Sequence, residues 1–192
     1  MANAFFNVPV PRNEAVKSYA PGSPEKKLLK AQLAAYKSTT VDIPMIIGGQ
    51  EVFTNNKVSI HPPHETKHLL GHFNKGNASH VQAAIDAALA AKSSWENTSW
   101  EHRAAVFLKA AELLAGPFRA KLNAATMLAQ SKNAFQAEID AACELIDFFR
   151  FNAQYMTDIY KEQPQSDHGI WNRLEHRPLE GFVFAITPFN FT

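Results

Sequence analysis

The middle of the chain carries apolar residues at the spacing of amphipathic helices. Starting near Ser79, apolar side chains recur at i, i+3, i+4, i+7 and i+8, which predicts one apolar stripe along a helix. The stripe consists of Val81, Ala84, Ile85, Ala88 and Leu89. A second helix is expected to begin after Ser99, which suits the N-cap position, and to close at Gly116-Pro117. A third helix follows from there to about Ser131.

Two more helices are indicated by their ends. Ser23 precedes Pro24-Glu25, the order of an N-cap, a first-turn proline and an acidic first turn, so a helix to about Tyr36 is expected. Residues 134–161 contain neither Gly nor Pro and are followed by Gln163-Pro164. This stretch predicts one long helix.

Short strands are predicted before and after this helical region. Met45–Ile47 and Glu51–Phe53 flank the pair Gly48-Gly49, which accepts the positive φ of a tight hairpin. Val58–Ile60 and Leu69–Phe73 have the composition of further short strands.

The carboxyl-terminal region predicts two strands of different burial. Ile170–Glu175 alternates apolar and polar side chains, which is typical of a half-exposed strand, whereas Phe182–Ile186 is a continuous apolar run, which favours a buried one. Pro178 separates them. Strands mixed with helices place the chain in the α/β class.

Composition narrows the range of partners. Hydrophobic residues make up 46% and charged residues 19% of the 192 residues, as in ordinary globular proteins. Nineteen basic and eighteen acidic residues leave a net charge of +1, so neither nucleic acid nor an anionic membrane is an expected partner. No secretory signal or membrane span is expected either. Small molecules or other protein chains remain, with the cytoplasm as the default location.

Asn190 is the strongest candidate for chemistry. It follows Phe182–Ile186 and a Thr187-Pro188 turn, so it lies at the carboxyl end of a predicted strand, where open α/β sheets bind ligands. Its side-chain amide can donate a hydrogen bond to an oxyanion that develops during acyl transfer. The residues alone fit a plain turn equally well, because Pro and Asn favour turns.

Glu144 is the second candidate. Its neighbours at helical spacing include Asp140, Asp147 and Phe148, and none is a cation. Such a carboxylate either reaches solvent or awaits a cationic group from elsewhere, and composition alone favours the solvated face.

Cysteine and histidine residues offer weaker candidates. The single cysteine, Cys143, lies within the predicted long helix beside acidic residues, which would raise its pKa and suppress the thiolate, so a structural role is expected. Four histidines imitate metal-ligand spacing, but Pro62-Pro63 would break a helix that aligned them. No metal site is therefore expected at His61, His64, His68 and His72.

Two segments carry a family resemblance. The ending Gly181-Phe-Val-Phe-Ala-Ile-Thr-Pro-Phe-Asn-Phe-Thr192 resembles the aldehyde dehydrogenase segment that carries the oxyanion-hole asparagine. The segment Glu138-Ile-Asp-Ala-Ala-Cys-Glu-Leu-Ile-Asp-Phe-Phe-Arg-Phe-Asn152 is similar to a helix of one branch, the 1-pyrroline-5-carboxylate dehydrogenases. Trp171, Asn172 and His176 match no pattern of the family.

The resemblance implies roles for particular residues. Asn190 would be the oxyanion-hole donor, Glu144 would face the substrate amino group, and Phe191 would pack on the aliphatic part of the substrate. Cofactor contacts are implied for the turn that precedes Asn190, namely Ile186, Thr187, Pro188 and Phe189. NAD is the implied cofactor.

The resemblance also implies a fold and its division. The expected fold is the N-terminal part of an aldehyde dehydrogenase, a Rossmann-like cofactor domain with the start of a β oligomerisation arm, incomplete. Residues 1–168 would begin the NAD-binding domain, residues 169–178 the arm, and residues 179–192 the first strand with its Asn turn. The arm implies a homo-oligomer. No Gly-x-Gly-x-x-Gly occurs, and the nucleophilic cysteine and general base of the family lie further along, so this chain alone is expected to be inactive.

For a complete enzyme, the resemblance implies NAD-dependent oxidation of L-glutamate γ-semialdehyde to L-glutamate in proline degradation. The small-molecule partner is then an aldehyde. Three alternatives stay open: an aldehyde dehydrogenase of another substrate class, a truncated module that binds a full-length subunit, and a non-catalytic subunit. The mitochondrial matrix is the alternative location.

Overall fold

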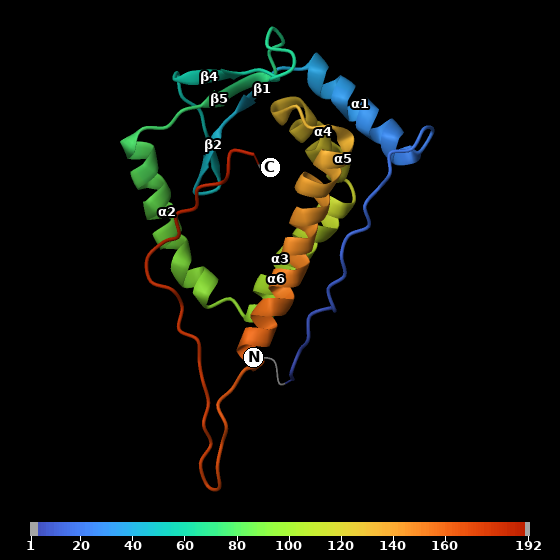
Figure 1. Cartoon of the computed structure of the whole chain (residues 1–192). Helices are drawn as coiled ribbons and strands as arrows, with labels where there is room; N and C mark the ends of the chain where they lie inside the picture. Colours follow the sequence, from blue (N-terminus) through green and yellow to red (C-terminus); the bar gives the residue numbers. More distant parts are fainter. Residues whose placement is uncertain (1–3, 191–192) are drawn as a thin grey trace.

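The structure is a computed structural model that describes residues 4–190 as a helical stack beside two small sheets (Figure 1). The helical elements are α1 (Pro24–Ser38), α2 (Ala78–Glu96), α3 (Trp100–Ala115), α4 (Arg119–Gln130), α5 (Ala134–Gln136), the π-helix η1 (Ala137–Cys143) and α6 (Glu144–Lys161). None of the helices in this part of the chain is long and apolar enough to cross a membrane.

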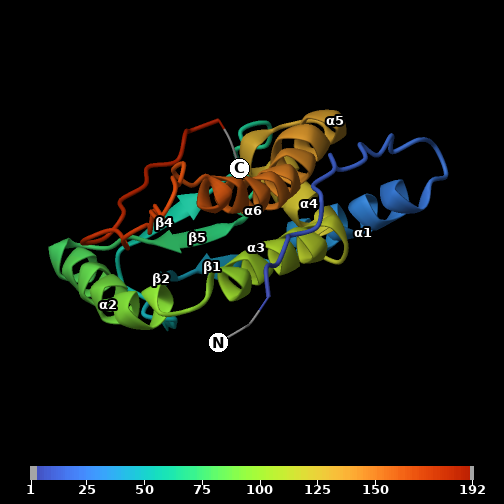
Figure 2. The ribbon, with the colours of Figure 1, turned by 90° about the horizontal axis from the view of Figure 1, so that it is seen from below.

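The core of the stack lies where α3 and η1 meet α6. Ala111 and Ala142 are almost fully buried, and their small side chains let the helix axes approach each other closely. Ile146 is 0% exposed, and the rings of Phe107 and Phe149 lie 5.8 Å apart between centroids. Helix α1 packs on α4 at the other side of the stack (Figure 2). These contacts confirm the helices that apolar spacing predicts.

The helix starts follow side-chain capping. Ser23 accepts a hydrogen bond from the Lys26 N–H, which confirms the predicted N-cap of α1. Helix α2 begins one residue before the predicted Ser79, because Asn77 accepts from Ser79 N–H and His80 N–H. The apolar stripe on α2 is not covered by other elements, since no residue of this helix is buried in the described part of the chain.

The predicted long helix is only partly α-helical. Residues 134–161 are helical throughout, but η1 follows the i→i+5 pattern, and the Glu144 N–H binds the Ile139 carbonyl. The absence of Gly and Pro was sufficient to predict a continuous helix and gave no signal for the wider turn.

Two small sheets form beside the helices. Strand β5 (Gly71–Asn74) pairs in parallel with β1 (Val41–Ile43) and antiparallel with β4 (Lys57–Ile60). The predicted hairpin is confirmed as β2 (Met45–Ile47) and β3 (Gln50–Val52). Gly48 and Gly49 adopt φ values of 58° and 78° there. The sequence missed β1, whose three residues are all exposed and show no alternation.

The Asn74 side chain fastens β1 to the segment that follows β3. Its Nδ2 donates to Asp42 Oδ1 and to the Ile43 carbonyl, both at 2.9 Å, and its Oδ1 accepts from Thr54 N–H. Asn74 is 5% exposed. Buried amides are stable when their hydrogen bonds are made, so this one holds the β-rich part together.

The two predicted carboxyl-terminal strands do not form. Residues 163–174 make a hairpin-like excursion, but its ladder is a single bridge between Asp167 and Ile170 (Figure 1). Side chains replace the missing backbone bonds: Asn172 N–H donates to Ser166 Oγ, and Leu174 N–H donates to Gln163 Oε1.

The segment expected to form a buried strand is extended and exposed. Val183 is 80% and Ile186 81% exposed. A strand requires a hydrogen-bonding neighbour, and residues 4–190 supply none for this segment, so the predictions for Ile170–Glu175 and Phe182–Ile186 were wrong for this chain.

An amino-terminal arm, defined here as residues 4–22, lies along the helical stack (Figures 1 and 2). Glu14 pairs with Arg119 and Arg150, and its N–H donates to Asp147 Oδ1. Tyr19, a non-glycine residue with a φ of 53°, donates its hydroxyl hydrogen to Glu138. The amino-terminal arm is thus held in place by buried charges, which the sequence did not reveal.

Candidate functional site

Asn190 lies in a turn at the end of the exposed extended segment. Residues 189 and 190 form the turn, as the Thr-Pro-Phe-Asn pattern predicts. The backbone carbonyl of Asn190 accepts a hydrogen bond from Lys132 Nζ at 2.8 Å. This contact brings the carboxyl-terminal turn to the helical stack, although the two residues are separated by 58 positions in the sequence.

Lys132 connects this turn to η1. It lies between α4 and α5, and its Nζ is 3.1 Å from Asp140 Oδ2. Asp140 belongs to η1, four residues before Glu144. The sequence did not reveal Lys132, because this cation lies outside the helical spacing around Glu144 and reaches Asp140 only in the folded chain.

Glu144 is the first residue of α6 and is partly buried. Within residues 4–190 the structure holds no hydrogen bond or ion pair from its carboxylate. The neighbouring Asp140 forms an ion pair with Lys132, whereas Glu144 forms no ion pair within these described residues. A partly buried carboxylate without a cationic partner suits a positively charged ligand.

The remaining predicted contacts are not assembled into a pocket. Phe191 lies outside the described residues. Ile186, Thr187, Pro188 and Phe189 are all exposed, with Phe189 96% exposed. They are part of the exposed segment that leads into the Asn190 turn.

Cys143 faces the helical interior rather than a substrate site. It is buried, and Arg119 Nη2 lies 3.3 Å from its Sγ. Burial, reinforced by the negative charge of Glu138, raises the thiol pKa to about 11. The predicted increase in pKa is confirmed. The surroundings of Cys143 are not only acidic, however, because Arg119 touches the sulfur.

The histidines contact polar groups of the chain rather than one another's rings. His61 Nδ1 lies 2.8 Å from the His68 carbonyl, and His64 Nδ1 lies 2.8 Å from Ser131 Oγ. His72 is in β5. Over residues 4–190, no group of three or more His, Cys, Asp or Glu side chains is arranged to hold a metal ion.

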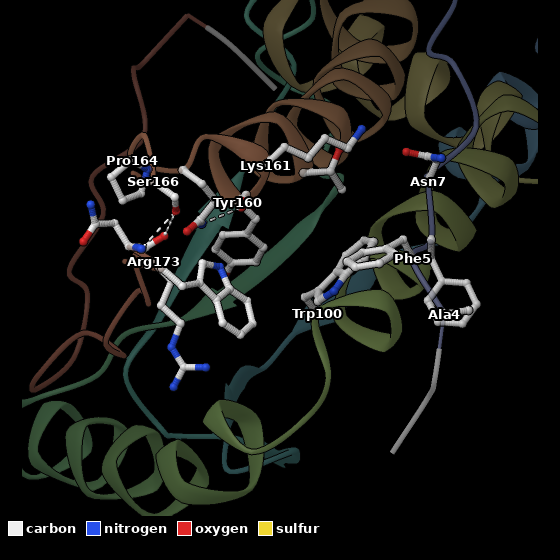
Figure 3. A pocket seen from close by; sticks show the side chains of 14 residues that line it. Ala4, Phe5, Asn7, Trp100, Tyr160, Lys161, Pro164, Ser166 and Arg173 are labelled. Carbon is white, nitrogen blue, oxygen red and sulfur yellow. Dashed lines mark hydrogen bonds between the residues drawn. The ribbon is translucent and has the colours of Figure 1, made fainter. Parts of the chain in front are cut away.

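A cavity of about 610 Å³ lies elsewhere, between the amino-terminal arm and the 163–174 excursion (Figure 3). Figure 3 shows Phe5 beside Trp100 on one side and Arg173 on the other, with Tyr160 between them. None of the predicted site residues within the described range 4–190 lines it. Its walls also include Trp100 of α3 and Thr157, Tyr160 and Lys161 of α6.

These features were compared with known proteins. The model of the aldehyde dehydrogenase family matches residues 52–192, so the chain belongs to that family. Two similar curated relatives are a delta-1-pyrroline-5-carboxylate dehydrogenase from Agaricus bisporus, 52% identical over 98% of the chain, and a mitochondrial one from Emericella nidulans, 46% identical over 98%.

A solved structure is similar throughout. The delta-pyrroline-5-carboxylate dehydrogenase from Mycobacterium tuberculosis bound with NAD is 49% identical and superimposes with a TM-score of 0.97 over 99% of the chain. The chain spans about a third of the length of these proteins, 35% of the Agaricus protein and 36% of the solved chain. The predicted fold class is confirmed: an α/β chain with the N-terminal part of the aldehyde dehydrogenase fold, incomplete.

Proposed function

We propose that the complete protein containing this chain oxidises L-glutamate γ-semialdehyde, the open form of 1-pyrroline-5-carboxylate, to L-glutamate with NAD. The observation that carries this proposal is the similarity along the whole chain to proteins named for that activity, 52% identity in the Agaricus protein. Within residues 4–190, Glu144 has no ionic partner and lies near the connection that holds the Asn190 turn, which supports the proposal.

In this proposal Asn190 stabilises negative charge. A cysteine thiolate supplied by another part of the enzyme attacks the aldehyde carbon, and the carbonyl oxygen becomes an oxyanion. The Asn190 amide donates a hydrogen bond to that oxygen, which lowers the barrier by a few kcal/mol at most. Once the substrate carbon has lost its hydride, water hydrolyses the resulting thioester, which releases the acid and restores the thiol.

Glu144 and Phe191 would select the substrate. The carboxylate of Glu144 would attract the ammonium group of the amino-acid aldehyde, and Phe191 would cover its aliphatic carbons. Because no described residue neutralises Glu144, its charge is available for the ligand.

NAD would accept the hydride that leaves the substrate carbon. Exposed apolar side chains at Ile186 and Phe189 fit contact with a flat ring, but they offer no donors for phosphates. We therefore assign residues 186–189 to the edge of the cofactor site only. Residues elsewhere in the enzyme must therefore bind the phosphates of NAD.

The test is an assay of the complete gene product with and without Asn190→Ala. NADH formation from L-glutamate γ-semialdehyde should fall by about 100-fold or more in the variant, as for loss of one oxyanion-hole donor. An undiminished rate would contradict the role of Asn190. A wild-type enzyme that prefers an aldehyde without an amino group would instead indicate another substrate class.

A non-catalytic module is the second candidate. The exposed apolar segment at residues 182–189 and the 163–174 excursion would suit docking on a full-length subunit. The gene sequence after Thr192 separates the two: a stop codon favours the module, and an open frame that encodes a cysteine nucleophile favours the enzyme.

Assembly and location are also proposed. We propose that residues 169–178 begin an arm that pairs between subunits, with residues 1–168 in the cofactor domain and residues 179–192 leading to the active site. The mitochondrial name of the Emericella relative supports the matrix over the cytoplasm. Fluorescence of a tagged complete protein in its own cells would decide the location.

A further inference from the structure

Lys132 joins two segments that the proposed reaction requires to stay together. Its ammonium is 2.8 Å from the Asn190 carbonyl and 3.1 Å from Asp140 Oδ2. Its side chain is only 14% exposed, and that of Asp140 is 34% exposed. An ion pair sheltered in this way is screened less by water than a surface pair.

The geometry restrains the ammonium from two sides. Asp140 lies on the π-helical turn directly before Glu144, and this turn packs against α4. The carboxylate therefore fixes Lys132 to a rigid element. From that position Lys132 donates to the backbone of the very residue whose side chain is the proposed oxyanion donor.

The Asn190 turn needs such an anchor. The extended segment before it is exposed, with Val183 at 80% and Phe184 at 78%, and it belongs to no strand in the described part of the chain. An oxyanion donor works only when it is held within a fraction of an ångström of the developing charge. A backbone bond to the turn limits both its position and its rotation.

We infer that Lys132 is a positioning residue: it holds the Asn190 turn against the helix that carries Glu144 and so sets the oxyanion donor relative to the substrate-binding carboxylate. This inference rests on the proposed function. Lys132 itself touches neither substrate nor cofactor in this assignment.

The test uses the complete enzyme with Lys132→Met, Lys132→Arg and Asp140→Asn. Lys109→Met is the matched control, because Lys109 forms an exposed ion pair with Glu112 on α3. In single-turnover experiments, Lys132→Met should slow NADH formation by about 10- to 100-fold, part of the loss expected on removing the donor itself. The KM for NAD should change by less than about twofold, because the lost interaction is expressed in the transition state.

The conservative variant distinguishes positioning from general support. Lys132→Arg should recover most of the rate, because a guanidinium can donate to both oxygens. The rate of NADH formation by Asp140→Asn should lie between the rates of Lys132→Met and the wild type. A Lys132→Met enzyme with the rate of Lys109→Met would overturn the inference, and so would Lys132→Arg that is as slow as Lys132→Met.

A second measurement remains decisive if the complete protein does not oxidise the amino-acid aldehyde. That result would reject the proposed function, and amide hydrogen exchange would then test the anchor by itself. The peptide that contains Asn190 should exchange faster in Lys132→Met than in Lys109→Met. Equal exchange in the two variants would show that Lys132 does not hold the turn.

Discussion

Arg119 on α4 and Glu138 on η1 form a buried ion pair, with side chains 3% and 0% exposed. Arg119 also binds Glu14 and the Ala15 carbonyl, and Glu138 also accepts from the Lys17 N–H and the Tyr19 hydroxyl. The pair therefore binds the amino-terminal arm to the same helical turn that leads to Glu144.

Breaking this pair should destabilise the protein strongly. Glu138→Gln leaves the Arg119 charge buried with one carboxylate fewer, and loss of one partner of a buried pair costs about 3–5 kcal/mol. Urea unfolding should show the loss as a lower midpoint. The exposed pair of Lys109 and Glu112 provides the control, since Glu112→Gln should change stability by less than about 1 kcal/mol. Similar midpoints for the two variants would contradict the expectation.

Acid should weaken the same network. Burial opposes ionisation of Glu138, but hydrogen bonds from Arg119, Lys17, Tyr19 and Asn123 outweigh it and hold its pKa below the ordinary value of 4.5. Because the folded-state pKa is lower than the unfolded one, the stabilisation is complete above about pH 4.5 and is lost as the pH falls through the folded pKa.

Urea midpoints between about pH 3 and pH 7 would measure this dependence. Glu14 contributes with the same sign, because Arg119 and Arg150 lower its pKa although burial opposes ionisation. Glu138→Gln should flatten the acid side of the profile. A profile as steep as that of the wild type would show that Glu138 is not responsible.

Cys143 should react slowly while the protein is folded. With its pKa raised to about 11 by burial, the thiolate is scarce at pH 8. Modification by a chromogenic disulfide reagent should be at least about 100-fold slower than in the unfolded chain, where the pKa is near 8.5. Rapid reaction in native buffer, at the rate found in urea, would mean that the thiol is accessible.

Replacing Glu144 should alter substrate selection. In the complete enzyme, Glu144→Ala should reduce kcat/KM for L-glutamate γ-semialdehyde by about 10- to 100-fold, the effect of removing one charged partner of a ligand. Activity on an aldehyde of similar length without the amino group should change by less than about threefold. The ratio of the two values is the measurement, and equal losses would argue against recognition of the ammonium group.

Local signals in the sequence were enough for the helices and the hairpin. Ser23 and Gly116 mark helix ends through their own chemistry, and Gly48-Gly49 marks a turn that other residues adopt only with strain. Such features depend on neighbours within a few residues, which the sequence displays directly.

The features that the sequence did not reveal depend on distant partners. Arg119 contacts Glu138 at a separation of 19 residues, and Lys132 contacts Asn190 at a separation of 58. The predicted strand at Phe182–Ile186 failed for the related reason that a strand exists only beside another. Chemical type and family resemblance were enough to find the candidate residues. The residues that hold them in position, such as Lys132, could be identified only from the folded structure.

The attachment of the amino-terminal arm imposes an order on biosynthesis. The Tyr19 hydroxyl cannot form its hydrogen bond to Glu138 until Glu138 has been synthesised, 119 residues later. At about 5–20 residues per second, the ribosome takes roughly 6 to 24 seconds to cover that interval. The hydrogen bond between Tyr19 and Glu138 can therefore secure the arm only after this interval.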